Sequence, residues 1–141
     1  MLTRRGFAGF ASCAICAATG FMATAASADN APPPSGISRK TLSEMDGPMP
    51  GYVTINMEVD IEPGAFIVRH THPGIESGYV IEGGLDVPIQ GQPTRSLKMG
   101  DGYQVPPETP HAGAKNGDKL TRLAITYVVE KGKPLITPVP G

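Results

Sequence analysis

Residues 64–83 read GAFIVRHTHPGIESGYVIEG, and this stretch places His70 and His72 two positions apart in an apolar run. On a β-strand, residues i and i+2 point to the same face, about 6.6 Å apart. The two imidazoles can therefore reach one point. A Pro-Gly pair ends the strand and bends the chain, so that Glu76 can return its carboxylate to the same point.

The chain contains three histidines, and the third, His111, lies in its second half. Three neutral imidazoles and one carboxylate form a mixed nitrogen and oxygen donor set, which zinc, copper, iron, nickel and manganese accept. A histidine in an apolar run is more often a buried core residue than a ligand. The spacing of the surrounding residues has to decide between these two interpretations.

The rest of the sequence predicts strands. Residues 52–61 alternate apolar and polar side chains with the period of two that is typical of a half-buried strand. The same alternation returns at 85–90, where Pro88 indicates an edge or unpaired position, and at 123–129. Only residues 38–45 have marginal helical periodicity. Short strands separated by turns rich in Gly and Pro predict an all-β sandwich or barrel.

Residues 1–28 have the three parts of an export signal. Arg4 and Arg5 supply a positive start, residues 7–22 an apolar middle, and residues 26–28 a small-residue cleavage site. A membrane anchor is the alternative, but the apolar run is shorter than the roughly 20 residues that a spanning helix needs. We expect cleavage, a periplasmic or secreted protein, and no membrane attachment afterwards.

The start of this signal, TRRGF at residues 3–7, resembles the twin-arginine signal, which a transporter of already folded proteins reads. Ala8 and Gly9 depart from the usual Leu-Lys ending. An ordinary secretory signal that happens to hold two arginines is the alternative interpretation.

Cleavage would leave 113 residues, enough for one domain. Residues 29–36 (DNAPPPSG) read as a Pro-rich linker, and residues 37–141 as that domain. Cys13 and Cys16 would leave with the signal, so disulfides would not hold the mature chain together. Loss of two arginines changes the formal charge from −1 to −3, which excludes attraction to nucleic acid or anionic lipid.

The histidine pair belongs to a longer pattern of fixed positions. The residues Gly64-x5-His70-x-His72-x3-Glu76-x6-Gly83 resemble the first motif of the cupin superfamily at every fixed position. This match favours metal ligands over core histidines.

The second cupin motif is traced from Gly100 through five residues to Pro106 and through four more to His111. Glu108 stands where the family usually has glycine, and Asn116 falls one residue later than the usual asparagine. Because that glycine would suit a positive φ, we expect a local rearrangement of the turn. We place Glu108 on the surface in preference to a role as acid or base at the mouth of a pocket.

The resemblance covers Gly64 to Asn116, roughly half of the mature chain. It implies a small, single-domain, exported bacterial cupin with a β-barrel or jelly-roll fold, which commonly forms homodimers by sharing edge strands. It also implies a metal site without assigning catalytic residues. The implied ligands are His70, His72, Glu76 and His111.

An octahedral ion with four protein ligands keeps two positions for water, substrate or dioxygen. Divalent affinities rise toward copper, so a site that folds after export would tend to take copper or zinc. If the chain folds before export, the metal ions available in the cytoplasm determine which one binds, and we therefore favour manganese or iron. Copper, nickel and zinc are the alternatives.

Strand parity suggests what surrounds the ion. Phe66 and Val68 share the predicted face of His70 and His72, while Gly78 and Val80 share that of Glu76; these residues line a pocket or form core. A polar contact from Tyr103 or Gln104 is expected near the second motif.

Such a pocket suits a small aromatic or carbonyl-bearing molecule better than a charged sugar nucleotide. We expect a metal-dependent, oxygenase-like enzyme. A non-catalytic module for a small ligand or metal, and an isomerase or lyase, are the alternatives, because the fold does not choose among them.

Overall fold

The structure, a computed structural model, describes residues 36–113 and 117–140. The predicted signal, most of the predicted linker, and Asn116 lie outside the described residues. None of the described residues belongs to a helix long and apolar enough to cross a membrane. They form ten strands: β1 (Ile37–Asp46), β2 (Tyr52–Ile61), β3 (Ile67–Thr71), β4 (Gly74–Glu82), β5 (Gly84–Val87), β6 (Arg95–Lys98), β7 (Gly102–Val105), β8 (His111–Gly113), β9 (Thr121–Glu130) and β10 (Thr137–Pro138).

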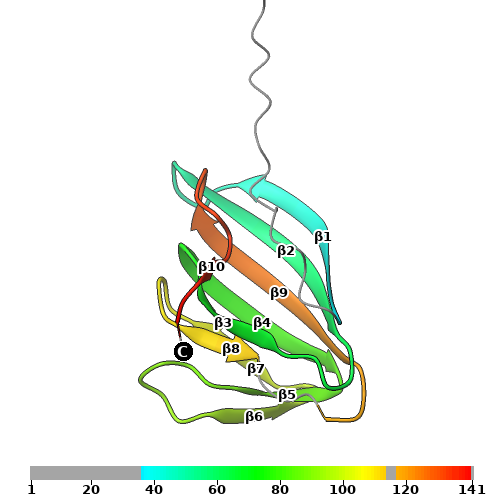
Figure 1. Cartoon of the computed structure of the whole chain (residues 1–141). Helices are drawn as coiled ribbons and strands as arrows, with labels where there is room; N and C mark the ends of the chain where they lie inside the picture. The colour runs from blue at the N-terminus through cyan, green and yellow to red at the C-terminus, as the bar shows by residue number, and fades with distance from the viewer. Residues whose placement is uncertain (1–35, 114–116, 141) are drawn as a thin grey trace, which may run out of the picture.

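The strands form three antiparallel sheets in two layers (Figure 1). The large sheet has the order β1-β2-β9-β4-β7, and the smaller sheets are β10-β3-β8 and β5-β6. Strand β2 pairs with β9 along its whole length, from Tyr52 opposite Glu130 to Ile61 opposite Thr121. The predicted all-β jelly roll is confirmed.

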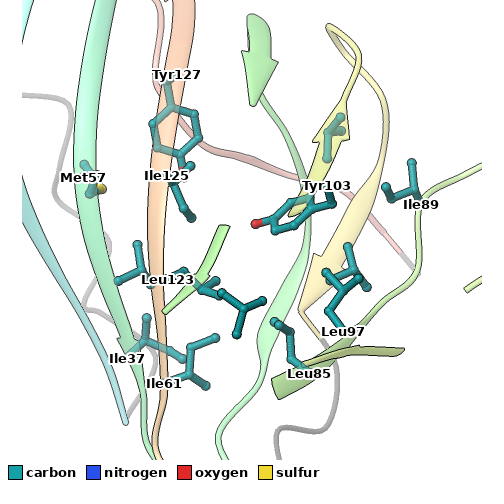
Figure 2. Packing of buried hydrophobic residues seen from close by; sticks show 14 of the residues in the cluster. Ile37, Met57, Ile61, Leu85, Ile89, Leu97, Tyr103, Leu123, Ile125 and Tyr127 are labelled. Atoms are coloured by element: carbon teal, nitrogen blue, oxygen red, sulfur yellow. The ribbon is translucent and has the colours of Figure 1, made fainter. Parts of the chain in front are cut away.

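The core lies between the layers (Figure 2). The alternation that predicts the strand at residues 52–61 is confirmed, because Val53, Met57, Val59 and Ile61 are buried while Asn56 is exposed. Each such side chain contributes about 1.5–3 kcal/mol when it leaves water. The buried hydrophobic residues of β9 that face them are Leu123, Ile125, Tyr127 and Val129.

The weak helical periodicity at residues 38–45 is overridden, because this segment is part of the edge strand β1. Hydrogen bonding to β2 decides its conformation, and the register places Arg39 opposite the buried Val59. A register shift between Thr41 and Ser43 marks a bulge, which breaks the alternation of faces along the strand.

A second irregularity reverses the predicted parity of β3. From Ile67 to His70, β3 advances three residues while its partner β8 advances only two. The extra residue turns Ile67 toward the interior together with His70. Phe66 and Val68 are instead 60% and 44% exposed, so the prediction that they line the pocket or the core is wrong.

The turn before β8 keeps the conformation that suits glycine. Glu108 has a φ of 53°, so the side chain is accommodated in the left-handed region and the predicted rearrangement of the turn is wrong. Its backbone N–H donates to the carbonyl of His72 over 2.9 Å. Glu108 itself is exposed, which confirms the surface position.

Candidate metal centre

Four predicted ligands from distant parts of the sequence converge inside the fold. His70 lies in β3, His72 one residue beyond its end, Glu76 in β4, and His111 at the start of β8. One potential donor atom from each residue lies within 4.8 Å of all the others. All four side chains are buried, with no more than 4% of each residue exposed.

The two layers contribute different donors. His70 and His111 are cross-strand partners in the small sheet, and their ring centroids are 4.3 Å apart. Glu76 belongs to the large sheet, where it pairs with Tyr127 of β9 and Val105 of β7. The site therefore joins the layers across the interior.

Backbone carbonyl groups orient all three imidazoles. The Nδ1 atoms of His70, His72 and His111 lie 2.7, 2.5 and 2.9 Å from carbonyl oxygens, which belong to Val68, Leu135 and Thr109. A carbonyl oxygen only accepts hydrogen bonds, so each Nδ1 carries the proton. In the neutral ring, each Nε2 then presents a lone pair to the centre. Histidine ligands of metals are commonly oriented in this way.

The distances among the inner atoms fit a shared cation. Nε2 of His72 is 2.6 Å, and that of His111 3.2 Å, from Oε2 of Glu76. Nε2 of His70 is 3.1 Å from Nε2 of His72, which brings two lone pairs together. Neighbouring ligands with bonds of about 2.0–2.1 Å at right angles are about 3 Å apart. The donor set and its spacing therefore fit a transition-metal ion.

The protonation states favour an anionic carboxylate among imidazoles. Burial is the main reason that the pKa of His70 is lowered to about 4; the charges of His111 and His72 add to this effect, while the carbonyl of Val68 and Glu76 oppose it. Burial alone would raise the pKa of Glu76, but hydrogen bonds with His111 and His72 lower it below its usual range. Burial lowers the pKa of His111, but Glu76 outweighs this effect and raises it. A metal ion needs the neutral form of this ring, so metal binding at His111 would compete with protonation.

Tyr103 provides the polar contact to the site that the sequence predicts from either Tyr103 or Gln104. Its hydroxyl donates to Oε1 of Glu76 over 2.6 Å, and Figure 2 shows it directed into the interior. Burial, together with Glu76, raises the pKa of Tyr103 well above its ordinary value. Gln104, the other candidate, is exposed and bonds to Ser77.

A cavity of about 20 Å³ adjoins His70 and Glu76 between the two layers and is lined by residues of both. This volume holds a water molecule or an ion. Among the described residues that line this cavity, Arg39 is the only lysine or arginine. The other lining residues are Val59, Ile67, Leu85, Val87, Tyr103, Ala112, Gly113, Leu123, Ile125, Tyr127 and Ile136.

Sequence reasoning missed several contributors to the site, among them the carbonyl of Thr109 that orients His111 and the two that follow. The first is Arg39, whose inward direction follows from the strand parity it shares with the buried Ile37. The second is Leu135, which contributes a backbone carbonyl to His72. A carbonyl contact depends on how the chain folds back, and no residue type signals it.

The chain matches the family profile described as Cupin domain over residues 57–133. This range contains the four candidate ligands. No curated protein sequence matches the chain.

Several solved structures share the fold. They include a cupin-like protein from Thermotoga maritima (25% identity, 74% of this chain and 77% of that chain, TM-score 0.59). The polyketide cyclase RemF from Streptomyces resistomycificus is 20% identical (76% and 73%, TM-score 0.59). The DMSP lyase DddQ from Ruegeria pomeroyi is 21% identical (61% and 43%, TM-score 0.56), so this chain spans less than half of that lyase.

Proposed function

The chain belongs to the cupin superfamily, and we propose that it binds one divalent transition-metal ion through four buried side chains: His70, His72, Glu76 and His111. One observation carries this proposal. Three Nδ1–H groups are tied to carbonyl oxygens, so three Nε2 atoms are directed at one point beside the Glu76 carboxylate. A packed core gains nothing from three adjacent lone pairs, whereas an ion needs them.

Manganese or iron is the proposed ion, with copper, nickel and zinc as the alternatives. The donor set of three imidazoles and a carboxylate suits all five. The preference follows from the proposed folding of the chain in the cytoplasm, before stronger competitors are met outside it.

The proposed activity is that of an oxygenase-like enzyme on a small organic substrate. When bound, the ion would supply Lewis-acid or redox chemistry for such a substrate and dioxygen. The chain itself holds the ligands in place, excludes bulk water with its buried apolar lining, and keeps a proton on Tyr103 next to Glu76.

Metal content tests the site directly. Elemental analysis of protein purified from its native compartment should give one transition-metal ion per chain, and His72→Ala and Glu76→Gln should lose it. Asn56→Ala, on the exposed face of β2, is the control and should keep it. An unchanged metal content in both site variants would contradict the proposal.

Oxygen consumption tests the activity. Metal-loaded protein should consume oxygen with at least one member of a panel of catechols, flavonols, thiols and diketones, and the His72→Ala variant should not. A filled site that consumes no oxygen across the panel would favour one of the two alternatives below.

The first alternative is a non-catalytic module that binds a small ligand or the metal itself. The small cavity supports it, because about 20 Å³ admits an organic substrate only if side chains at the cavity move. Metal binding without turnover of any substrate would be the expected result.

The second alternative is an isomerase or lyase, which needs a group that transfers protons. The buried hydroxyl of Tyr103, beside the cavity, supports it. One of the solved structures similar to this chain is named a lyase and another a cyclase, but at 20–21% identity they share only the fold with it. Loss of a substrate-dependent reaction in Tyr103→Phe, without any oxygen uptake, would favour this alternative.

Export through the twin-arginine route is also part of the proposal, supported by the residues TRRGF near the start of the sequence. In a bacterial host, the full chain should appear in the periplasm. Replacement of both arginines by lysine (Arg4→Lys and Arg5→Lys) should retain it in the cytoplasm. Unchanged export of that double variant would favour the ordinary secretory route.

A homodimer is proposed as the assembly. Strand β1 is an edge of the large sheet, and the exposed apolar side chains near that edge are Leu42, Met45 and Met49. Exposed apolar groups on a long edge strand favour pairing with another chain. Light scattering should give a dimer mass, and Met45→Lys should shift it toward the monomer; a monomeric wild-type protein would contradict the proposal.

A further inference from the structure

Arg39 lies between the interior cavity and solvent. It is on β1, opposite the buried Val59, and its side chain is half-buried where it lines the cavity. His70 and Glu76 line the same cavity. The cavity therefore connects Arg39 with two of the four candidate ligands.

The guanidinium of Arg39 lacks a partner within the described part of the chain. No carboxylate there forms an ion pair with it, and no hydrogen bond holds it. By contrast, Arg122 on the outer face of the large sheet holds Asp60 with two hydrogen bonds of 2.7 and 2.8 Å. Removing a charge partly from water without a partner costs free energy.

The charges around the cavity favour an anion. Glu76 is the single carboxylate among the described residues that line it, and this carboxylate is already engaged by Tyr103, His72 and His111. A divalent ion on the four ligands would more than neutralise it. The cavity would then present two positive centres, the ion and Arg39, to any ligand.

The size and shape of the cavity narrow the class of anion. A volume of about 20 Å³, surrounded mostly by apolar side chains, holds a water-sized group. Even the smallest organic anion therefore enters only when side chains at the cavity move, and a large or highly hydrated group is excluded. A carboxylate is planar and matches the two parallel N–H donors of a guanidinium. We propose that the cavity binds a small carboxylate, which pairs with Arg39 and is directed by it toward the metal centre.

This inference deepens the proposed function and rests on it in one respect: the proposed metal ion is the second group that the carboxylate approaches, after Arg39. It narrows the expected small organic ligand to a carboxylate, because Arg39 lines the cavity and the sequence did not predict it there. Arg39 is a specificity-determining residue in this scheme: it selects the charge of the ligand and orients it.

The test uses acetate and pyruvate as probes, with the neutral acetamide and pyruvamide as matched controls. Isothermal titration calorimetry is performed on metal-free and zinc-loaded protein. We expect the wild-type protein to bind each carboxylate at least about tenfold more tightly than its amide, because the charge-assisted pair is lost with the amide. Arg39→Gln should weaken carboxylate binding about tenfold and leave amide binding unchanged.

Lys40→Gln is the matched control, since Lys40 is the next residue of the same strand, exposed, and carries the same charge. It should bind like wild type. Arg39→Lys, which keeps the charge without the planar fork, should give an intermediate affinity and guards against a folding defect in Arg39→Gln.

Three outcomes would overturn the inference: no carboxylate binding by the wild-type protein, equal losses in Arg39→Gln and Lys40→Gln, or inorganic phosphate bound more tightly than either carboxylate through Arg39. Failure of the metal site is recognised separately, by the absence of zinc in elemental analysis. The metal-free titrations still decide the role of Arg39 in that case.

Discussion

The hydroxyl of Tyr103 donates a hydrogen bond of 2.6 Å to Oε1 of Glu76, and both residues are buried. Oε2 of the same carboxylate contacts His72 and His111. The two oxygens of Glu76 thus differ in their surroundings: Oε1 is held by Tyr103, whereas Oε2 faces the histidines and could bind an ion. Tyr103 is therefore a positioning residue for the proposed metal site.

Tyr103→Phe removes this hydrogen bond and keeps the ring. We expect metal affinity to fall about tenfold, because outer partners of metal ligands typically contribute 10–100-fold. Competition with a fluorescent chelator measures the change. Tyr79→Phe, on the exposed face of β4, is the control and should have no effect. Equal affinities of Tyr103→Phe and wild type would show that the hydrogen bond does not support metal binding.

Gly78→Ala tests how Tyr103 is accommodated. A Cβ at Gly78 would lie 2.2 Å from Cε1 of Tyr103, so the buried ring would have to move away from Glu76. We expect a loss of about 1–3 kcal/mol in the free energy of unfolding, measured in urea, together with weaker metal binding. At Gly102, on the adjacent β7, the nearest atom to a new Cβ is 3.4 Å away, so Gly102→Ala should be tolerated. Equal stability of the two variants would contradict the packing described for Tyr103.

Glu108→Gly should stabilise the protein. Glu108 is exposed and has a φ of 53°, a conformation that costs a residue with a Cβ about 1–2 kcal/mol and costs glycine little. Part of this gain is offset by the greater freedom of glycine in the unfolded chain, so we expect a net gain of up to about 1 kcal/mol. Glu108→Ala keeps the strain and should show no such gain in thermal or urea unfolding. A loss of stability in Glu108→Gly would mean that the glutamate has a stabilising contact.

Asp60 should make stability sensitive to acid. Its carboxylate receives two hydrogen bonds from Arg122, its cross-strand partner, and these lower its pKa below the ordinary value of 3.8 despite partial desolvation. A lowered pKa in the folded state stabilises the fold above pH 3.8, and this contribution disappears as the pH falls through the folded-state pKa.

Urea unfolding of metal-free wild type and Asp60→Asn between pH 7 and pH 2.5 measures this effect. The wild-type advantage should be constant near neutral pH and shrink below about pH 4. Parallel pH profiles of the two proteins would contradict the assigned role of the ion pair.

The fold and three of the four candidate ligands could be predicted from local spacing, whereas His111, 35 residues beyond Glu76, was implied by the resemblance to the cupin motifs. The alternation of residues 52–61 predicts β2 with its observed bounds, since a half-buried strand needs one apolar face. The spacing of His70, His72 and Glu76 predicts their convergence, because the two histidines share one face of a strand and the bend after it returns Glu76 to that face.

The lining of the site could not be predicted, because it depends on irregular pairing. The extra residue of β3 before His70 exposes Phe66 and Val68, and only hydrogen bonding with β8 reveals it. Arg39 was missed because the conformation of residues 38–45 is decided by pairing with β2 and not by their own weak periodicity. Register is a property of two strands together, and one segment does not encode it.

The carbonyl of Leu135 accepts the Nδ1 proton of His72, although 63 residues separate the two in the sequence. During synthesis on a ribosome, the ring of His72 therefore acquires its final orientation only after residue 135 has emerged and folded back. The nascent chain would offer an ion an incomplete set of oriented donors until then. Binding of the proposed ion would accordingly come late in folding, and the compartment in which the segment around Leu135 docks would decide which cations compete for the site.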